Sequence, residues 1–128
     1  MSRAIAQELA SYLDQRAGDS LRAVGHYSAD DYEIVYLRDD VRDRYSDADI
    51  KEIVKNLRWE SFAKSTHEGQ YHLGSLNCSI QAFVEGVVMQ FPYDDKHGTL
   101  ITLDPGAARQ LVAFIDDCLT RIEQVRNE

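Results

Sequence analysis

Cysteine, proline and long apolar runs are all scarce in this chain of 128 residues. Two cysteines and two prolines are too few for a disulfide-rich scaffold or a proline-rich linker. No apolar run approaches the roughly 18 residues that a membrane span needs, and Gln7 and Glu8 make the start unlike a secretion signal. We therefore expect one soluble globular domain over residues 1–128, located in the cytoplasm.

Lysine is scarce as well, because the chain has 4 lysines against 10 arginines. It has 14 aspartates and 8 glutamates, which give a net charge of −8. Such a surface repels phosphate backbones and anionic lipids, so we expect neither a nucleic-acid nor a membrane partner. A surface rich in aspartate and poor in lysine suits a salt-rich cytoplasm, where the Debye length falls to about 3 Å at 1 M salt.

Apolar residues recur with a helical period in three segments, and five short runs bounded by turns are typical of strands. The stretch 61–74 has no clear period, and we expect it to be irregular. Asp104 before Pro105 is typical of a capped helix start, as is Ser46 with Asp49 three residues later. The predicted helices cover 3–17, a stretch opening at Ser46, and 105 to about 124; the predicted strands cover 21–27, 32–38, 76–84, 87–91 and 99–103.

Short turns between consecutive strands make those strands antiparallel. The sequence therefore predicts an α+β fold with a mostly antiparallel five-stranded sheet and three helices, in the order α-β-β-α-β-β-β-α. This order resembles the roadblock and profilin-like folds, in which a five-stranded sheet lies between helices. We expect the strands at 32–38 and 75–84 to form the two edges of the sheet.

One stretch resembles a known family more closely. Residues 32–46, Tyr-Glu-Ile-Val-Tyr-Leu-Arg-Asp-Asp-Val-Arg-Asp-Arg-Tyr-Ser, are followed by Leu-Asn-Cys at 76–78 and Phe-Pro at 91–92. Together they are similar to a family of small acidic proteins from haloarchaea, over about residues 20 to 120. The resemblance implies a salty cytoplasm, but it implies no activity and identifies no functional residue.

Two apolar faces are patterned for burial. In the strand at 76–84, alternate residues are apolar, and in the last helix the apolar residues form a broad stripe. Cys78 lies on the first face and Cys118 on the second, so we expect two buried, free thiols. The faces consist of Leu76, Cys78, Ile80, Ala82 and Val84 in the strand, and of Leu111, Phe114, Ile115, Cys118, Leu119 and Ile122 in the helix.

The charged run at 37–44 is the first candidate binding site, with Arg38, Asp39, Asp40 and Arg42 as its main residues. An arginine fork can grip a carboxylate or phosphate, and the paired aspartates can act as acid and base or dock a partner. Alternatively, the opposite charges pair with one another on the surface of a strand-to-helix connection.

Trp59 and Phe62 are the second candidate site. If the helix that opens at Ser46 continues past Leu57, Trp59 lies opposite its apolar stripe and forms a contact patch with Phe62. If that helix stops near Arg58, Trp59 folds back onto the sheet instead. The sequence leaves both alternatives open.

No motif in the chain indicates a cofactor, a metal or a catalytic residue. It has no nucleophile elbow, P-loop or dinucleotide fingerprint. His67 and His72 are five residues apart, so on a helix their side chains point in different directions and cannot bind the same metal ion. We expect a non-enzymatic interaction or regulatory module that binds protein and self-associates as a homodimer. The alternatives are a small-molecule-binding domain with a pocket near 61–74, and an enzyme that uses Arg38, Asp39 and Asp40.

The charge predicts a response to salt. The melting temperature is expected to rise as KCl is increased from about 0.1 to 3 M, because a net charge of −8 is poorly screened at low ionic strength. Differential scanning calorimetry across this series measures the effect. A flat response contradicts adaptation to a salt-rich solvent.

Overall fold

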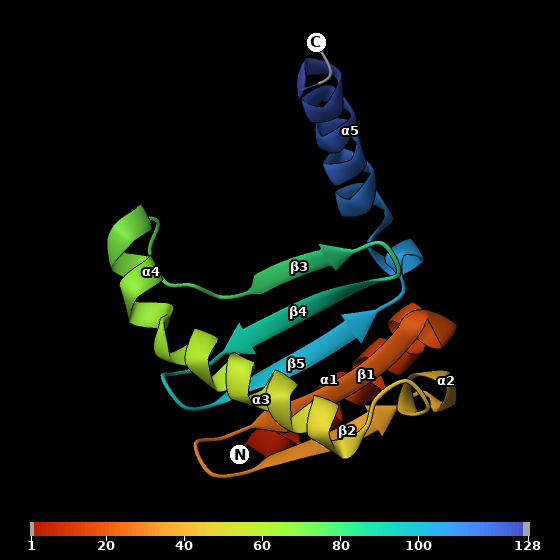
Figure 1. The fold of residues 1–128 in the computed structure, drawn as a ribbon. Helices are drawn as coiled ribbons and strands as arrows, with labels where there is room; N and C mark the ends of the chain where they lie inside the picture. Colours follow the sequence, from red (N-terminus) through yellow and green to blue (C-terminus); the bar gives the residue numbers. More distant parts are fainter. Residues whose placement is uncertain (1, 127–128) are drawn as a thin grey trace.

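A five-stranded sheet runs through the molecule and separates two faces (Figure 1). The structure is a computed structural model that describes residues 2–126. The strand order is β2-β1-β5-β4-β3, and every neighbouring pair is antiparallel, so the expected edges are confirmed. The strands are β1 (Leu21–Tyr27), β2 (Tyr32–Leu37), β3 (Ser79–Phe83), β4 (Gly86–Pro92) and β5 (Gly98–Leu103).

The helices differ from the prediction in number and order. The described chain has five α-helices instead of three, in the order α1-β1-β2-α2-α3-α4-β3-β4-β5-α5. They are α1 (Ser2–Ala17), α2 (Asp39–Arg42), α3 (Asp47–Phe62), α4 (Lys64–Tyr71) and α5 (Arg109–Arg126), with 3-10 turns η1 (Gly18–Ser20) and η2 (Pro105–Ala108).

The two helices that the sequence did not predict have no buried stripe. The single turn α2 buries only Val41, which is too little for a helical period to be recognised. Helix α4 buries no residue and lies where irregular chain was expected. Lys64 pairs with Glu68 one turn later, and the Glu68 carboxylate also accepts a hydrogen bond from the backbone N–H of Leu76.

Helix α1 covers one face of the sheet over β1, β2 and β5. Its Ala6 belongs to the buried core with Leu21, Val24, Ile101 and Leu103, and the half-buried residues of α1 pack around them. The helix predicted at 3–17 is thus confirmed. It ends at Ala17, and the next residue, Gly18, has a φ of +54°, a left-handed conformation that favours glycine.

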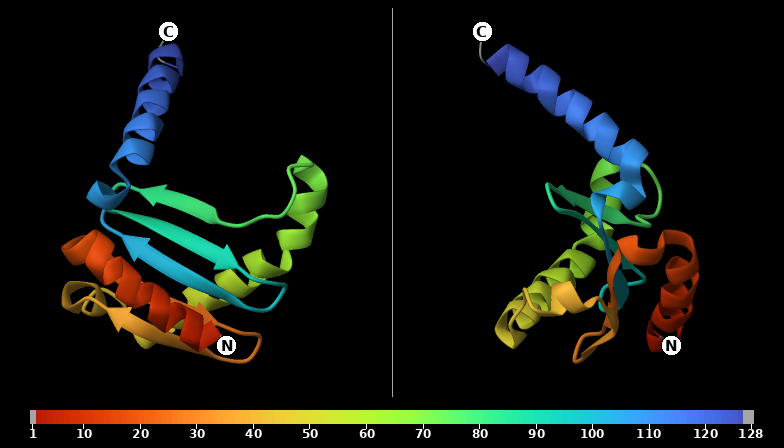
Figure 2. Two further views of the ribbon diagram at one scale, coloured as in Figure 1. Left: turned by 180° about the vertical axis from the view of Figure 1, so that it is seen from behind. Right: turned by 90° about the vertical axis from the view of Figure 1, so that its right-hand side faces the viewer.

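Helix α3 lies on the opposite face from α1 (Figure 2). It starts with the predicted capping box, in which Ser46 and Asp49 exchange side-chain to backbone hydrogen bonds. Polar contacts attach its C-terminal half to the sheet. Arg58 donates to the carbonyls of Ser28 and Asp31, and the Gln90 amide donates to the Leu57 carbonyl at 2.9 Å.

None of the helices within residues 2–126 is long and apolar enough to cross a membrane.

The packing of Tyr27 over Gly98 predicts a sensitive position. A Cβ on Gly98 would collide with the Tyr27 hydroxyl, and it would lie 2.9 Å from the Phe91 carbonyl oxygen. Tyr27 is fully buried and accepts a hydrogen bond from Gln90, so it cannot move aside. Gly98→Ala is expected to lower the free energy of unfolding by about 3 kcal/mol.

Gly69→Ala is the matched control, because a Cβ at this position in α4 meets only open space. It is expected to raise the free energy of unfolding by about 0.5 to 1 kcal/mol. Urea denaturation measures both variants. Equal stability of Gly98→Ala and wild type contradicts the packing of Tyr27 on β5.

Candidate functional site

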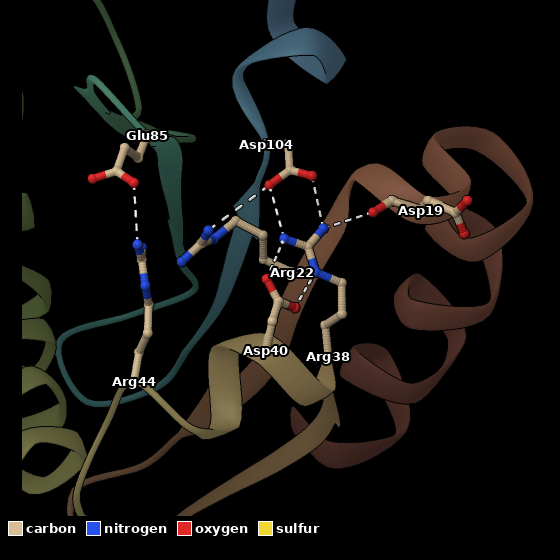
Figure 3. Close-up of polar contacts among 7 residues, drawn as sticks. All are labelled: Asp19, Arg22, Arg38, Asp40, Arg44, Glu85 and Asp104. Carbon is tan, nitrogen blue, oxygen red and sulfur yellow. Dashed lines mark hydrogen bonds and ion pairs between the residues drawn. The ribbon is translucent and has the colours of Figure 1, made fainter.

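Arg38 is the centre of a charged cluster at one end of the sheet (Figure 3). Its Nε donates to Asp40 at 2.6 Å, and its Nη1 and Nη2 donate to the two carboxylate oxygens of Asp104 at 2.7 and 3.0 Å. Nη1 also donates to the Asp19 carbonyl oxygen, and Nη2 to Asp40. Five hydrogen bonds match the five N–H donors of a guanidinium, so Arg38 has no donor left for a ligand.

These bonds join three segments that are far apart in the sequence. Arg38 follows β2, Asp19 lies in η1, and Asp104 follows β5. Asp104 was expected to cap the helix after it, but its side chain caps nothing and its carboxylate binds Arg38 instead. The strength of a bidentate arginine–carboxylate pair explains this choice of partner.

The cluster shifts the pKa values of its members. The Arg38 guanidinium lowers the pKa of Asp104 below its usual value, although partial burial opposes this shift. Arg38 lowers the pKa of Asp40 in the same way. The two carboxylates in turn raise the pKa of Arg38. All three groups are therefore charged at neutral pH.

Asp39 and Arg42 lie outside this cluster. Asp39 is almost fully exposed, and its carboxylate is 3.4 Å from the Arg42 guanidinium one turn later in α2. The structure thus brings Arg38 and Asp40 together and leaves Asp39 and Arg42 on the surface. For Arg38 and Asp40, it favours the interpretation in which charges pair within the chain.

Trp59 and Phe62 are exposed, because α3 continues to Phe62 and does not stop near Arg58. Trp59 is 73% exposed and Phe62 is 68% exposed. The alternative in which Trp59 folds back onto the sheet is therefore wrong. Trp59 also borders a groove between α3 and the sheet.

A groove of about 870 Å³ lies between α3 and the sheet. Its floor includes Val88 and Leu100, and its helix side includes Ile53 and Leu57. At its polar end, Arg44 donates to Glu85 at 3.1 Å. Arg22 from β1 lies between this pair and the Arg38 cluster (Figure 3).

Arg22 is the functional candidate that the sequence analysis missed. Its only signal was a charged residue within the apolar run Leu-Arg-Ala-Val at 21–24. In the structure it is only 9% exposed, and its Nη1 lies 3.8 Å from an Asp104 oxygen.

Helix α5 leaves the sheet and projects away from it (Figures 1 and 2). It buries no residue, and its main contacts are with the adjoining η2. Most of its predicted apolar stripe is exposed: Phe114 is 66% exposed, and Leu119 and Ile122 are at least half exposed, as is Val125 beyond the predicted stripe. The expected burial of Cys118 is therefore wrong.

The sheet is also uncovered beside α1. Cross-strand pairing of Ile80 with Met89, and of Met89 with Ile101, places these side chains on the face that α1 covers elsewhere. Within the described residues, no α-helix packs over this part of β3 and β4 (Figure 2). Ile80 is 46% exposed, and Val84 lies exposed in the turn after β3, so the expected burial of this face is wrong as well.

Both cysteines are free thiols, as expected. Cys78 precedes β3 and is half-buried, and this burial raises the pKa of its thiol. Among residues 2–126, no three histidine, cysteine, aspartate or glutamate side chains are grouped so that they could hold a metal ion.

The comparison with known families gives one match. A family model described as "Domain of unknown function (DUF7522)" matches residues 7–123. No curated protein matches the sequence. Because the match spans most of the chain, the chain belongs to this family.

The Arg38 cluster predicts a loss of stability on substitution. Arg38→Met removes every bond of the cluster and leaves the half-buried Asp104 carboxylate without its main partner. We expect the free energy of unfolding to fall by about 2 kcal/mol. Asp39→Ala is the control and is expected to leave stability unchanged, because Asp39 is exposed and outside the cluster.

The same cluster predicts a pH dependence. A lowered pKa in the folded state means that Asp104 stabilises the fold above its unfolded pKa of about 3.8, and that this contribution is lost as the pH falls through the folded value. Asp104→Asn is therefore expected to lose less stability on acidification than wild type. Urea denaturation from about pH 2 to 7 tests this, and parallel profiles contradict the pairing.

Proposed function

We propose that this member of the DUF7522 family is a non-enzymatic protein-interaction module that self-associates as a homodimer. One observation carries the proposal: in the same chain most of the apolar stripe of α5 is exposed, and the apolar face of β3 and β4 beside α1 is only partly covered, with Ile80 exposed and Met89 and Phe91 half-buried. In the dimer, α5 of each protomer packs on β3 and β4 of its partner.

Helix α5 needs a surface to pack on. An isolated helix of 18 residues is only marginally stable in water, because most helical stability in proteins comes from packing of the apolar face. The stripe that includes Phe114, Leu119, Ile122 and Val125 extends along nearly the whole helix. A partner for this stripe must therefore be apolar and long.

The face of β3 and β4 matches that requirement. Helix α5 is about 27 Å long at 1.5 Å per residue, and the seven residues of β4 extend over about 23 Å. The exposed Ile80, together with the half-buried Met89 and Phe91, supplies apolar area beside α1. Packing of α5 here adds a second helix to the sheet face that α1 covers only in part.

A second copy fits both surfaces at once. In each chain α5 points away from its own sheet, and a twofold exchange doubles the contact. A stable protein interface needs about 1,200 Å² of buried surface, and both helix–sheet contacts contribute to it.

The sequence of the edge strand β3 does not hinder the approach of a second chain. Its sequence, Ser-Ile-Gln-Ala-Phe, contains no charged residue and no proline, the usual protection of an edge strand. The other edge, β2, carries Glu33, and its pairing with β1 shifts register between Val24 and Gly25. The unprotected edge is therefore the one next to the uncovered face.

Salt is part of this proposal. Two chains of −8 repel each other, and this repulsion is screened only at high ionic strength. The resemblance to acidic haloarchaeal proteins supports a salty cytoplasm as the setting. On the opposite face of the sheet, the exposed Trp59 and Phe62 at the end of α3 offer a separate surface for a further protein partner. Asp39 and Arg42 are exposed in α2 and remain candidate contacts for a partner as well.

Two charge-insertion variants and their mixture test the exchange. Ile80→Glu places a carboxylate on the sheet face, and Phe114→Glu places one on the α5 stripe; both side chains are exposed, so neither change should prevent folding. Sedimentation in 2 M KCl at tens of micromolar is expected to give a dimer for wild type and a monomer for each variant. An equimolar mixture of the variants is expected to recover dimer, because one helix–sheet contact is then free of substitutions.

Trp59→Glu is the matched control, since it charges a large exposed side chain on the other face and should leave the dimer intact. A monomeric wild type in 2 M KCl contradicts self-association. A wild-type dimer whose two variants stay monomeric when mixed contradicts the exchange of α5 and indicates another interface.

A further inference from the structure

Arg22 is a buried cation whose hydrogen-bonding capacity is unused. Its side chain is nine-tenths buried, yet it makes no side-chain hydrogen bond within residues 2–126. The nearest carboxylate oxygen, on Asp104, is 3.8 Å from Nη1, which is beyond hydrogen-bonding distance. That carboxylate already accepts two hydrogen bonds from Arg38.

A ligand can bind this group without displacing another hydrogen-bond partner. A guanidinium carries five N–H donors, and those of Arg22 keep contact with solvent where the residue borders the groove. Arg22 passes over Gly86, where its Nε lies 3.6 Å from the point that a Cβ on this glycine would occupy, and it borders the groove beneath α3. An acceptor can therefore reach it through the groove.

The rest of the groove is mostly apolar, although Glu33, Glu60 and several uncharged polar side chains also line it. Ile53 and Leu57 on α3 face a floor that includes Val88 and Leu100, and the volume of about 870 Å³ lies within the range of small-molecule sites. A ligand that binds Arg22 and also fills the apolar part of this groove needs a hydrogen-bond acceptor at one end and an apolar body.

The charges around Arg22 favour a single negative charge on the ligand. Arg22, Arg38 and Arg44 lie with three carboxylates, those of Asp40, Asp104 and Glu85. This set is balanced, and the carboxylates of Glu33 and Glu60 also line the groove, so a dianion meets more repulsion than a monoanion does. Arg44 and Glu85 are both largely exposed, so their pair can open to admit a ligand.

We infer that this groove binds a small amphipathic monocarboxylate, with its head group on Arg22 and its hydrocarbon body between α3 and the sheet. The site lies on the face opposite the surface assigned to α5. It therefore does not depend on self-association, and it adds a small-molecule ligand to the proposed interaction module.

Titration of the full-length protein with octanoate, followed by NMR, tests the inference. The largest shifts are expected at the Arg22 side-chain N–H and at the methyl groups of Val88 and Leu100. The neutral 1-octanol, the head group alone as acetate, and the dianion octyl phosphate are each expected to bind at least about tenfold more weakly.

Arg22→Met keeps the length of the side chain and removes its charge, and it is expected to weaken octanoate binding by about tenfold or more. Arg42→Met is the matched control, because Arg42 is exposed and does not border the groove. If Arg22→Met does not fold, the wild-type comparison of octanoate with 1-octanol decides the role of the head group.

Three results overturn the inference: no binding of octanoate, equal binding of octanoate and 1-octanol, or shifts confined to α5 and β3. The last result places the hydrocarbon on the surface assigned to the dimer. Because the titration is read residue by residue, a monomeric protein that still binds in the groove refutes the dimer and leaves the ligand site standing.

Discussion

A single amphipathic helix is too narrow to cover a five-stranded sheet, and much of this structure follows from that constraint. Helix α1 packs over β1, β2 and β5, and the core of Ala6, Leu21, Val24, Ile101 and Leu103 lies beneath it. The apolar side chains of β3 and β4 continue on the same face beyond its reach. Helix α5 also has an apolar stripe, and in the described structure it buries no residue. The proposed self-association joins these two unmatched surfaces.

The Arg38 cluster connects this constraint to the groove. By holding Asp104, Arg38 fixes the end of β5, and α5 departs from this point through η2. The same two hydrogen bonds occupy the Asp104 carboxylate and leave Arg22 with a distant partner. One bidentate pair thus fixes where the exposed helix begins and also leaves a buried guanidinium open toward the groove.

The sequence predicted the features that depend on local pattern. The stripe in α1, the hairpin of β1 and β2, the capping box at Ser46 and both sheet edges are all found in the structure. Helix α4 was missed because it buries nothing and therefore has no apolar period. The pairing of Arg38 with Asp104 was missed because 66 residues separate the two in the chain. Periodicity also identified the apolar faces at Ile80 and Phe114 correctly but could not indicate what covers them, so their expected burial within one chain was wrong.

Isotope-filtered NMR on a mixture of labelled and unlabelled chains in 2 M KCl tests the central claim most directly. We expect intermolecular nuclear Overhauser effects between Phe114 or Leu119 of one protomer and Ile80 or Met89 of its partner. These contacts are expected only between chains, because α5 points away from its own sheet. If the same pairs give contacts only within one chain, α5 folds back on its own β3 and β4, and the exchange of helices is refuted.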